Sequence, residues 1–224
     1  MPLNQTYRLD ATYAARPEAA ANGHAFRRWA KLAGVAPGRY YDVALALAAC
    51  DFGDRLVCEL GARCSYFGAY LTGWAAHVHV SDVCEKWDYL GGFDRWRSRW
   101  AATALSPERL TCDLQDATHT IYRDAAFDVV ASFSTIEHVA DPEAMAREMG
   151  RVCKPGGMVL LSTDVAPEPR RGFFTEAELG SRIVAPSGCT PIDGPAFDWD
   201  GADKMQHRDG FPFTCAFLAL EKPR

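Results

Sequence analysis

The 224-residue chain lacks several features that mark special classes of protein. It has no uninterrupted apolar window of about 18 residues, so we expect no membrane-spanning helix. Its first residues, MPLNQTYRLD, lack the apolar stretch of a secretory signal peptide. Internal repeats and low-complexity tracts are also missing. These absences predict a soluble, cytoplasmic globular protein.

The cysteines show no metal-binding or redox spacing. There are eight of them, and no two have the CxxC spacing of a zinc ribbon or a thioredoxin-like site. Cys58 lies in an apolar run, where a free thiol behaves as a small hydrophobic side chain. We therefore predict reduced thiols and no metal.

Composition and charge narrow the class of partner. The hydrophobic fraction of 48% and the charged fraction of 24% are ordinary for one globular domain. Acidic residues outnumber basic ones by 29 to 24, which gives a net charge of −5. This balance argues against nucleic acid as a partner and favours a small molecule.

Hydrophobic periodicity predicts strands that alternate with helices. The first fifty residues look helical, with one helix that carries Phe26, Trp29 and Leu32 and is ended by Gly34. Further predicted helices cover 40–49, 66–74, 87–105 and 141–154, and one more starts near Thr175. The predicted strands cover 55–60, 77–80, 109–112, 127–133, 158–163, 189–192 and 213–220. Asp141 can cap its helix, Pro142 fits the first turn, and Thr175 with Glu178 has the capping-box pattern. This alternation predicts an α/β fold with a mostly parallel seven-stranded sheet and helices on both faces.

The ends of the first strands carry the first functional signals, because ligands of such sheets bind outside the carboxyl ends of the strands. The first strand runs into ELGARCS, residues 59–65. A dinucleotide fingerprint would need glycines at 61, 63 and 66, and only Gly61 is present. Arg63 therefore counts against NAD or FAD, and leaves either a nucleoside ligand without a pyrophosphate or an ordinary strand-to-helix turn.

Acidic residues end the next two strands. Asp82 follows Glu59 by 23 residues, close to the spacing of an acid that binds ribose hydroxyls. On spacing alone, a solvated loop aspartate is an equal alternative. Asp113 and Leu114 end the third strand, where they could bracket an adenine edge.

The segment from Phe127 to Thr163, FDVVASFSTIEHVADPEAMAREMGRVCKPGGMVLLST, is the most specific feature of the chain. Its pattern FDxV…EHVxDP…ExxRVxKPGG resembles the class I S-adenosylmethionine (SAM)-dependent methyltransferases, and is similar to those of quinone biosynthesis. The resemblance extends more loosely back to Leu56. It implies a Rossmann-like sheet with SAM as the cofactor and methyl transfer to an oxygen or nitrogen of a small-molecule acceptor. It also implies a division into a helical N-terminal cap (1–50), a cofactor-binding core (51–164) and a substrate-side part (165–224).

The resemblance assigns roles by position. The methionine part of SAM would lie on the first turn, the ribose and adenine would lie at the next two strand ends, and the methyl group would lie near the fourth. The residues concerned are Glu59, Gly61, Ala62, Arg63 and Ser65 (methionine), Asp82 and Val83 (ribose and adenine), Asp113 and Leu114 (adenine), and Ser132 and Phe133 (beneath the cofactor). The family's turn normally has further glycines where Arg63 and Ser65 stand here. We hypothesise that Arg63 instead contacts the cofactor carboxylate.

Candidates for the catalytic and acceptor sides are fewer. His138 follows a strand end and an imidazole can act as a base near neutral pH, although a structural role of the Glu137-His138 pair is the favoured interpretation. Trp96 and Trp100 share a helix face, either as a pocket wall for the acceptor or, as we favour, packed on the sheet. Arg170 and Arg171 follow the fifth strand and could contact an anionic acceptor.

Two alternative functions are also considered. The altered turn at Arg63 and Ser65 motivates the first, a methyltransferase-like binding module without catalysis. The second is a nicotinamide-dependent oxidoreductase on a similar sheet, which the missing glycines disfavour.

Overall fold

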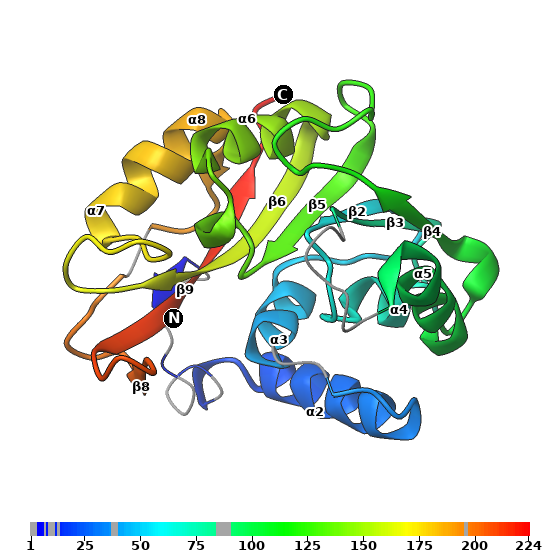
Figure 1. The fold of residues 1–224 in the computed structure, drawn as a ribbon, viewed down its shortest axis with the longest axis horizontal. Coiled ribbons are helices and arrows are strands. Elements are labelled where there is room, and N and C mark those ends of the chain that lie inside the picture. Colours follow the sequence, from blue (N-terminus) through cyan, green and yellow to red (C-terminus); the bar gives the residue numbers. More distant parts are fainter. Residues whose placement is uncertain are drawn as a thin grey trace.

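The computed structural model describes residues 4–6, 8, 12, 14–36, 40–83, 91–194 and 197–224. Its centre is a twisted sheet with the strand order β1-β9-β6-β5-β2-β3-β4, and two short strands, β7 and β8, pair with β9 (Figure 1). The strands are β1 (Gln5–Thr6), β2 (Leu56–Leu60), β3 (His77–Asp82), β4 (Leu110–Leu114), β5 (Phe127–Phe133), β6 (Cys153–Val165), β7 (Thr190–Pro191), β8 (Met205–Gln206) and β9 (Pro212–Glu221). The predicted Rossmann-like, mostly parallel seven-stranded sheet is confirmed, with the two short strands added to it.

Strand direction creates a switch point in the middle of the sheet. β2 pairs in parallel with β3 on one side and with β5 on the other, so the chain leaves β2 in one direction and later returns to its other edge. β4 and β6 extend these two halves in parallel, whereas β9 and β1 are antiparallel. The connection after β2 leads to β3 on one side, and the connection after β5 leads to β6 on the other side. Between these two connections, a crevice is expected at the carboxyl ends of β2 and β5.

Helices cover both faces of the sheet, as predicted (Figure 1). One face packs against α2 to α4 and α5 through side chains such as Phe26, Phe67 and Trp100. The other packs against α6 and the segment after β6 through Met145 and Ile183. The α-helices are α2 (Pro17–Leu32), α3 (Tyr40–Ala49), α4 (Phe67–Leu71), α5 (Gly92–Thr103), α6 (Pro142–Val152), α7 (Glu176–Glu178) and α8 (Ala185–Ser187), and a π-helix spans Leu179–Val184. Within the parts of the chain described above, no helix combines the length and the apolar character that a membrane crossing needs.

The α6 helix shows how local sequence sets an element. The Asp141 carboxylate accepts the N–H of Ala144 at 2.8 Å, which caps the helix as predicted. Pro142 stands in the first turn, and Met145 and Met149 are fully buried against the sheet. The predicted capping box at Thr175 is also present, with Glu178 bonded back to its backbone.

α2 carries Phe26, Trp29 and Leu32 and ends before Gly34, as predicted, and its first turns are rich in alanine. β6 begins at Cys153, directly after α6 and five residues before the predicted start, so the Pro155-Gly156-Gly157 run lies inside the strand. The predicted helix 87–105 is α5, and its first residues, 87–90, lie outside the described residues.

Candidate active site

A cleft of about 500 Å³ opens at the carboxyl ends of the central strands. Four connections line it, which come from the ends of β2, β3, β4 and β5. The lining residues fall at 61–65, 82–83, 115–117, 133–135 and 138–139. The cleft therefore occupies the crevice that the switch point predicts.

The turn after β2 requires glycine at its first position. Gly61 has a φ of 67°, in the left-handed region, and a Cβ there would lie 2.2 Å from Cγ2 of Thr135. The Thr135 hydroxyl donates a hydrogen bond to the Gly61 carbonyl at 3.0 Å. The close approach thus joins the β2 turn to the β5 connection and fixes the floor of the cleft.

Glu59 lies beneath this turn instead of lining the cleft. Its side chain is buried, accepts a short hydrogen bond from the Ser65 hydroxyl and accepts the N–H of Gly68 at 3.0 Å. Burial raises the pKa of this carboxyl to about 7. Glu59 therefore holds the shape of the turn from below.

Two tryptophans hold the turn from the side. Nε1 of Trp96 and of Trp100 donate to the carbonyl of Arg63, at 2.7 and 3.1 Å. Arg63 itself has a φ of 37°, a conformation unusual for a side chain with a Cβ. Both indoles are buried and neither lines the cleft. Their contacts agree with the packing interpretation that we favoured.

Asp82 lies where a ribose-binding acid is expected. It ends β3, lines the cleft and is 5% exposed. One of its oxygens accepts the N–H of Arg63 at 3.2 Å, which places the carboxylate at the edge of the β2 turn. Val83, 41% exposed, lines the cleft beside it.

The structure does not bring Asp113 and Leu114 to the cleft. The Asp113 carboxylate accepts the Tyr122 hydroxyl at 2.6 Å and contacts Nδ1 of His79 at 3.1 Å. The hydrogen bond with His79 helps to hold the pKa of Asp113 below its usual value. Leu114 is 57% exposed and does not line the cleft.

Residues further along this connection line the cleft in their place. They are Gln115, Asp116 and Ala117, which our sequence analysis did not identify. Asp116 forms a local turn in which its carboxylate accepts both the N–H (2.8 Å) and the hydroxyl (2.7 Å) of Thr118. An Asp-x-Thr turn after a strand is the signal that could have identified this segment.

The β5 connection provides the wall opposite Asp82. Phe133 and His138, which the sequence analysis singled out, both line the cleft. Ser134 also lines it, and the sequence analysis did not identify this residue. Ser132 is 1% exposed and lies within the strand behind the cleft surface. His138 ends a short 3-10 helix, Ile136–His138, and its N–H donates to the Thr135 carbonyl at 2.9 Å.

Glu137 and the two predicted acceptor-side arginines lie elsewhere. Glu137 is buried and its carboxylate accepts the Thr163 hydroxyl at 3.2 Å, which ties the β5 connection to β6. Arg170 and Arg171 are exposed on the connection after β6, where Arg170 stacks over the Phe211 ring at 4.3 Å. Neither arginine lines the cleft.

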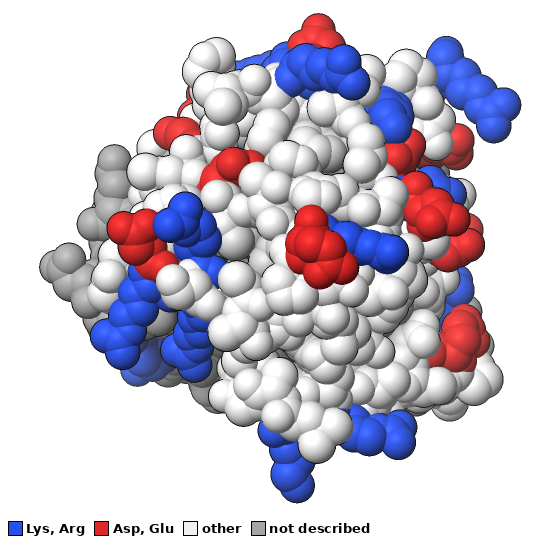
Figure 2. Space-filling model, turned by 90° about the vertical axis from the view of Figure 1, so that its right-hand side faces the viewer, with Lys and Arg blue, Asp and Glu red and all other residues white. Residues whose placement is uncertain are grey.

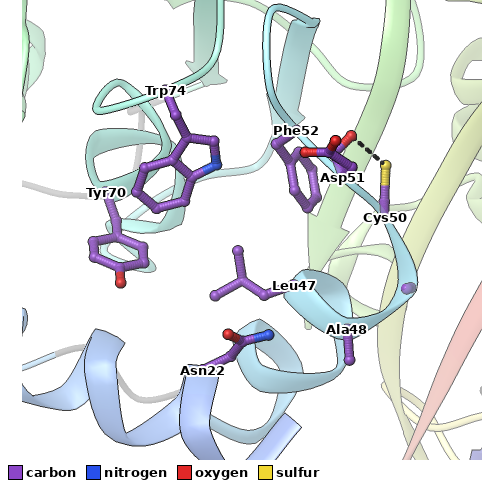
Figure 3. A pocket seen from close by; sticks show the side chains of 9 residues that line it. Asn22, Leu47, Ala48, Cys50, Asp51, Phe52, Tyr70 and Trp74 are labelled. Carbon is purple, nitrogen blue, oxygen red and sulfur yellow. Dashed lines mark hydrogen bonds between the residues drawn. The ribbon is translucent and has the colours of Figure 1, made fainter. Parts of the chain in front are cut away.

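A second, more open groove of about 540 Å³ lies at the opposite, amino-terminal edge of the sheet. Figure 3 shows Tyr70, Trp74 and Phe52 on one side of it and Leu47 and Asn22 on the other. Burial raises the pKa of the Cys50 thiol at its rim to about 11, so this thiol stays protonated near neutral pH. In the described part of the chain, no group of three or more His, Cys, Asp or Glu side chains is arranged to hold a metal ion.

Comparison with known proteins agrees with this geometry. The family model described as "Methyltransferase domain" matches residues 62–161. Demethylmenaquinone methyltransferase of Clavibacter sepedonicus is 29% identical over 166 residues, which cover 73% of this chain and 62% of that protein. Norajmaline N-methyltransferase of Rauvolfia serpentina is 41% identical over 54 residues, or 24% of this chain and 18% of that protein. 27-O-demethylrifamycin SV methyltransferase of Amycolatopsis mediterranei is 30% identical over 82 residues, or 35% and 30%. The chain thus spans less than two thirds of the length of each of these relatives.

Solved structures share the fold. The [4+2]-cyclase SpnF superposes with a TM-score of 0.63 at 17% identity, covering 83% of this chain and 82% of the cyclase. A SAM-dependent methyltransferase from Aquifex aeolicus superposes with a TM-score of 0.56 at 15% identity, covering 87% and 97%. The predicted resemblance to one large enzyme family is therefore confirmed, in sequence motifs and in fold.

Proposed function

We propose that this chain, a class I SAM-dependent methyltransferase by its motifs and fold, transfers the methyl group of SAM to an oxygen or nitrogen of a small molecule. The observation that carries the proposal is that the β2 turn and Asp82 line the same cleft and are linked by the hydrogen bond from the Arg63 N–H to the Asp82 carboxylate. Gly61 lines the cleft with its backbone held against Thr135, and Asp82 lines it at the end of the next strand. A cleft of about 500 Å³ has the size of small-molecule and cofactor pockets.

The residues that line the cleft fit SAM, which has a nucleoside part and an amino acid part and no pyrophosphate. Asp82 would accept hydrogen bonds from the ribose hydroxyls, because a carboxylate has two oxygens for a vicinal diol. Val83 and Ala117 would offer apolar surface to the adenine from the connections that follow two adjacent strands, β3 and β4. Residues 61–65 would hold the methionine part, and Phe133 would lie on the methyl side.

When bound, SAM supplies an activated sulfonium methyl group, so the chain's own task is to bind and orient. In-line alignment of donor and acceptor provides a large part of the rate enhancement. His138 lies on the β5 side of the cleft and would take the proton of a hydroxyl or a protonated amine. The buried Glu137 next to it holds the connection in place through Thr163.

The names of relatives support a small-molecule acceptor. One is named for N-methylation of norajmaline, and another acts on 27-O-demethylrifamycin SV according to its name. The net charge of −5 of this chain also argues against a nucleic-acid substrate.

Calorimetric titration with SAM and with S-adenosylhomocysteine tests the cofactor part of the proposal. We expect micromolar affinity, and a loss of at least about tenfold in Asp82→Asn, since a carboxylate that accepts hydrogen bonds is replaced by a neutral amide. Asp113→Asn is the matched control, because this acid ends the adjacent strand but points away from the cleft, and should change the affinity by less than about threefold. If neither ligand binds the wild-type protein, the proposal is wrong.

A second candidate function is a cleft that binds a ligand without methyl transfer. The observation in its favour is that a [4+2]-cyclase has the same fold, so the fold alone does not set the reaction. Release of S-adenosylhomocysteine from SAM in a screen of hydroxyl and amine acceptors would exclude this candidate. Binding of NAD(P)H instead of SAM would favour the oxidoreductase alternative.

A further inference from the structure

A small pocket of about 150 Å³ lies next to the cleft and shares part of its wall. Arg63 and Cys64 line both the pocket and the cleft. The pocket is completed by Ala36 and by Tyr66, Arg95, Trp96 and Arg99. Three arginines therefore line it, and none of the described residues that line it is acidic.

The arginines of α5 are placed by the helix and not by ion pairs. Arg95 and Arg99 are four residues apart, so they share one face of α5. Neither forms an ion pair within the described residues, and Arg99 stacks against the Tyr66 ring at 5.9 Å. Arg97, between them, instead pairs with Asp94 at 3.1 Å and does not line the pocket.

The indole hydrogen bonds fix this face relative to the cleft. Trp96 and Trp100, on the same helix, both donate to the Arg63 carbonyl. The helix that carries Arg95 and Arg99 is therefore attached to the β2 turn through the carbonyl oxygen of Arg63. A ligand that ordered these arginines would also order the turn on which the cleft depends.

We propose that this pocket is an oxyanion-binding subsite, which binds a phosphate or carboxylate of a molecule seated in the adjacent cleft. The proposal rests on the proposed function, because it needs a ligand in that cleft. Guanidinium groups recognise both anions by charge-assisted, often bidentate, hydrogen bonds. Three arginines around a pocket of this size, with no acid among the described residues that line it, favour an anion over a neutral or cationic group.

The oxyanion has two sources, an anionic group of the methyl acceptor or the carboxylate of the cofactor's methionine part. Both are consistent with the shared wall at Arg63 and Cys64. Figure 2 shows the side of the molecule that carries α5, where Lys and Arg side chains stand at the left and at the lower edge, and Asp and Glu side chains stand mainly at the centre and right.

Calorimetric titration of the full chain with inorganic phosphate at low ionic strength tests the subsite, and intrinsic tryptophan fluorescence is a second readout because Trp96 lines the pocket. We expect the phosphate Kd to rise at least about tenfold in Arg95→Gln/Arg99→Gln, since two charged donors are lost. Arg97→Gln removes a charge from the same helix outside the pocket, and should change the Kd by less than about twofold. An unchanged Kd in the double variant, or no phosphate binding by the wild type, would overturn the proposal.

A second arm of the experiment identifies the source of the oxyanion. With saturating S-adenosylhomocysteine, a weaker phosphate affinity assigns the pocket to the cofactor carboxylate, and an unchanged affinity assigns it to the acceptor. If S-adenosylhomocysteine does not bind at all, the proposed function fails, while a phosphate affinity that depends on Arg95 and Arg99 still supports the anion subsite. The two failures are therefore distinguishable.

Discussion

Glu59→Gln should reduce the dependence of stability on pH between about pH 4 and 7. Burial raises the pKa of Glu59 to about 7 in the folded protein, whereas an unfolded glutamate titrates near pH 4.3. Between these values the folded state holds the extra proton, so the free energy of unfolding falls as the pH rises. The difference corresponds to a total loss of about 3.7 kcal/mol once the pH is well above 7, at 1.36 kcal/mol for each pKa unit. A glutamine cannot ionise, and it can still accept the Gly68 N–H.

Urea unfolding at pH 5 and pH 8 measures this effect. The wild type should lose about 2 to 3 kcal/mol more between the two pH values than Glu59→Gln, because all other titrating groups are common to both proteins. Glu108→Gln, which removes an exposed carboxyl in a 3-10 turn, should follow the wild type. If Glu59→Gln loses as much stability as the wild type over this range, Glu59 is already ionised in the folded protein and the reasoning is refuted.

Two further predictions concern the support of the cleft. Gly61→Ala should lower the free energy of unfolding, measured in urea, by at least about 2 kcal/mol. The left-handed conformation is unfavourable for alanine, and its Cβ would collide with Thr135. An unchanged urea midpoint would show that the turn adapts. Glu148→Gln should cost about 3 kcal/mol in the same assay, since this 6%-exposed carboxylate accepts from Thr120 (2.6 Å) and pairs with Arg151 (2.6 Å). A loss below about 0.5 kcal/mol would show that the pair is screened by solvent.

Elements with a strong local pattern could be predicted from the sequence. The strand 127–133 is residue for residue β5, because FDVVASF is apolar apart from Asp128 and Ser132 and a mostly apolar run of this length is typical of a buried central strand. The cap and the apolar stripe of α6 were similarly sufficient. β1 could not be predicted, since it has two residues and exists through pairing with β9, more than 200 positions later. Contacts of that separation leave no periodic trace in the sequence.

The candidate site shows the same limit at the level of single side chains. The rule that ligands bind at the carboxyl ends of strands correctly located the cleft at Gly61 and Asp82. It misplaced Asp113, because successive side chains of a strand point to opposite faces of the sheet. Which face the last residue takes depends on its neighbours, here His79 on β3 and Tyr122 on the following connection. Only the assembled sheet decides this.

The missing glycines of the β2 turn now have a physical explanation. A second glycine lets a backbone approach its ligand, but Arg63 reaches a left-handed conformation without it because two indoles hold its carbonyl. The φ of 37° that costs energy at Arg63 is thus offset by hydrogen bonds from α5, an element that follows β3 in the chain. With its backbone fixed in this way, the Arg63 side chain contributes to the wall of the adjacent pocket. Arg63 and the two tryptophans therefore act as one structural unit, and replacing both indoles while Arg63 is kept should open the turn.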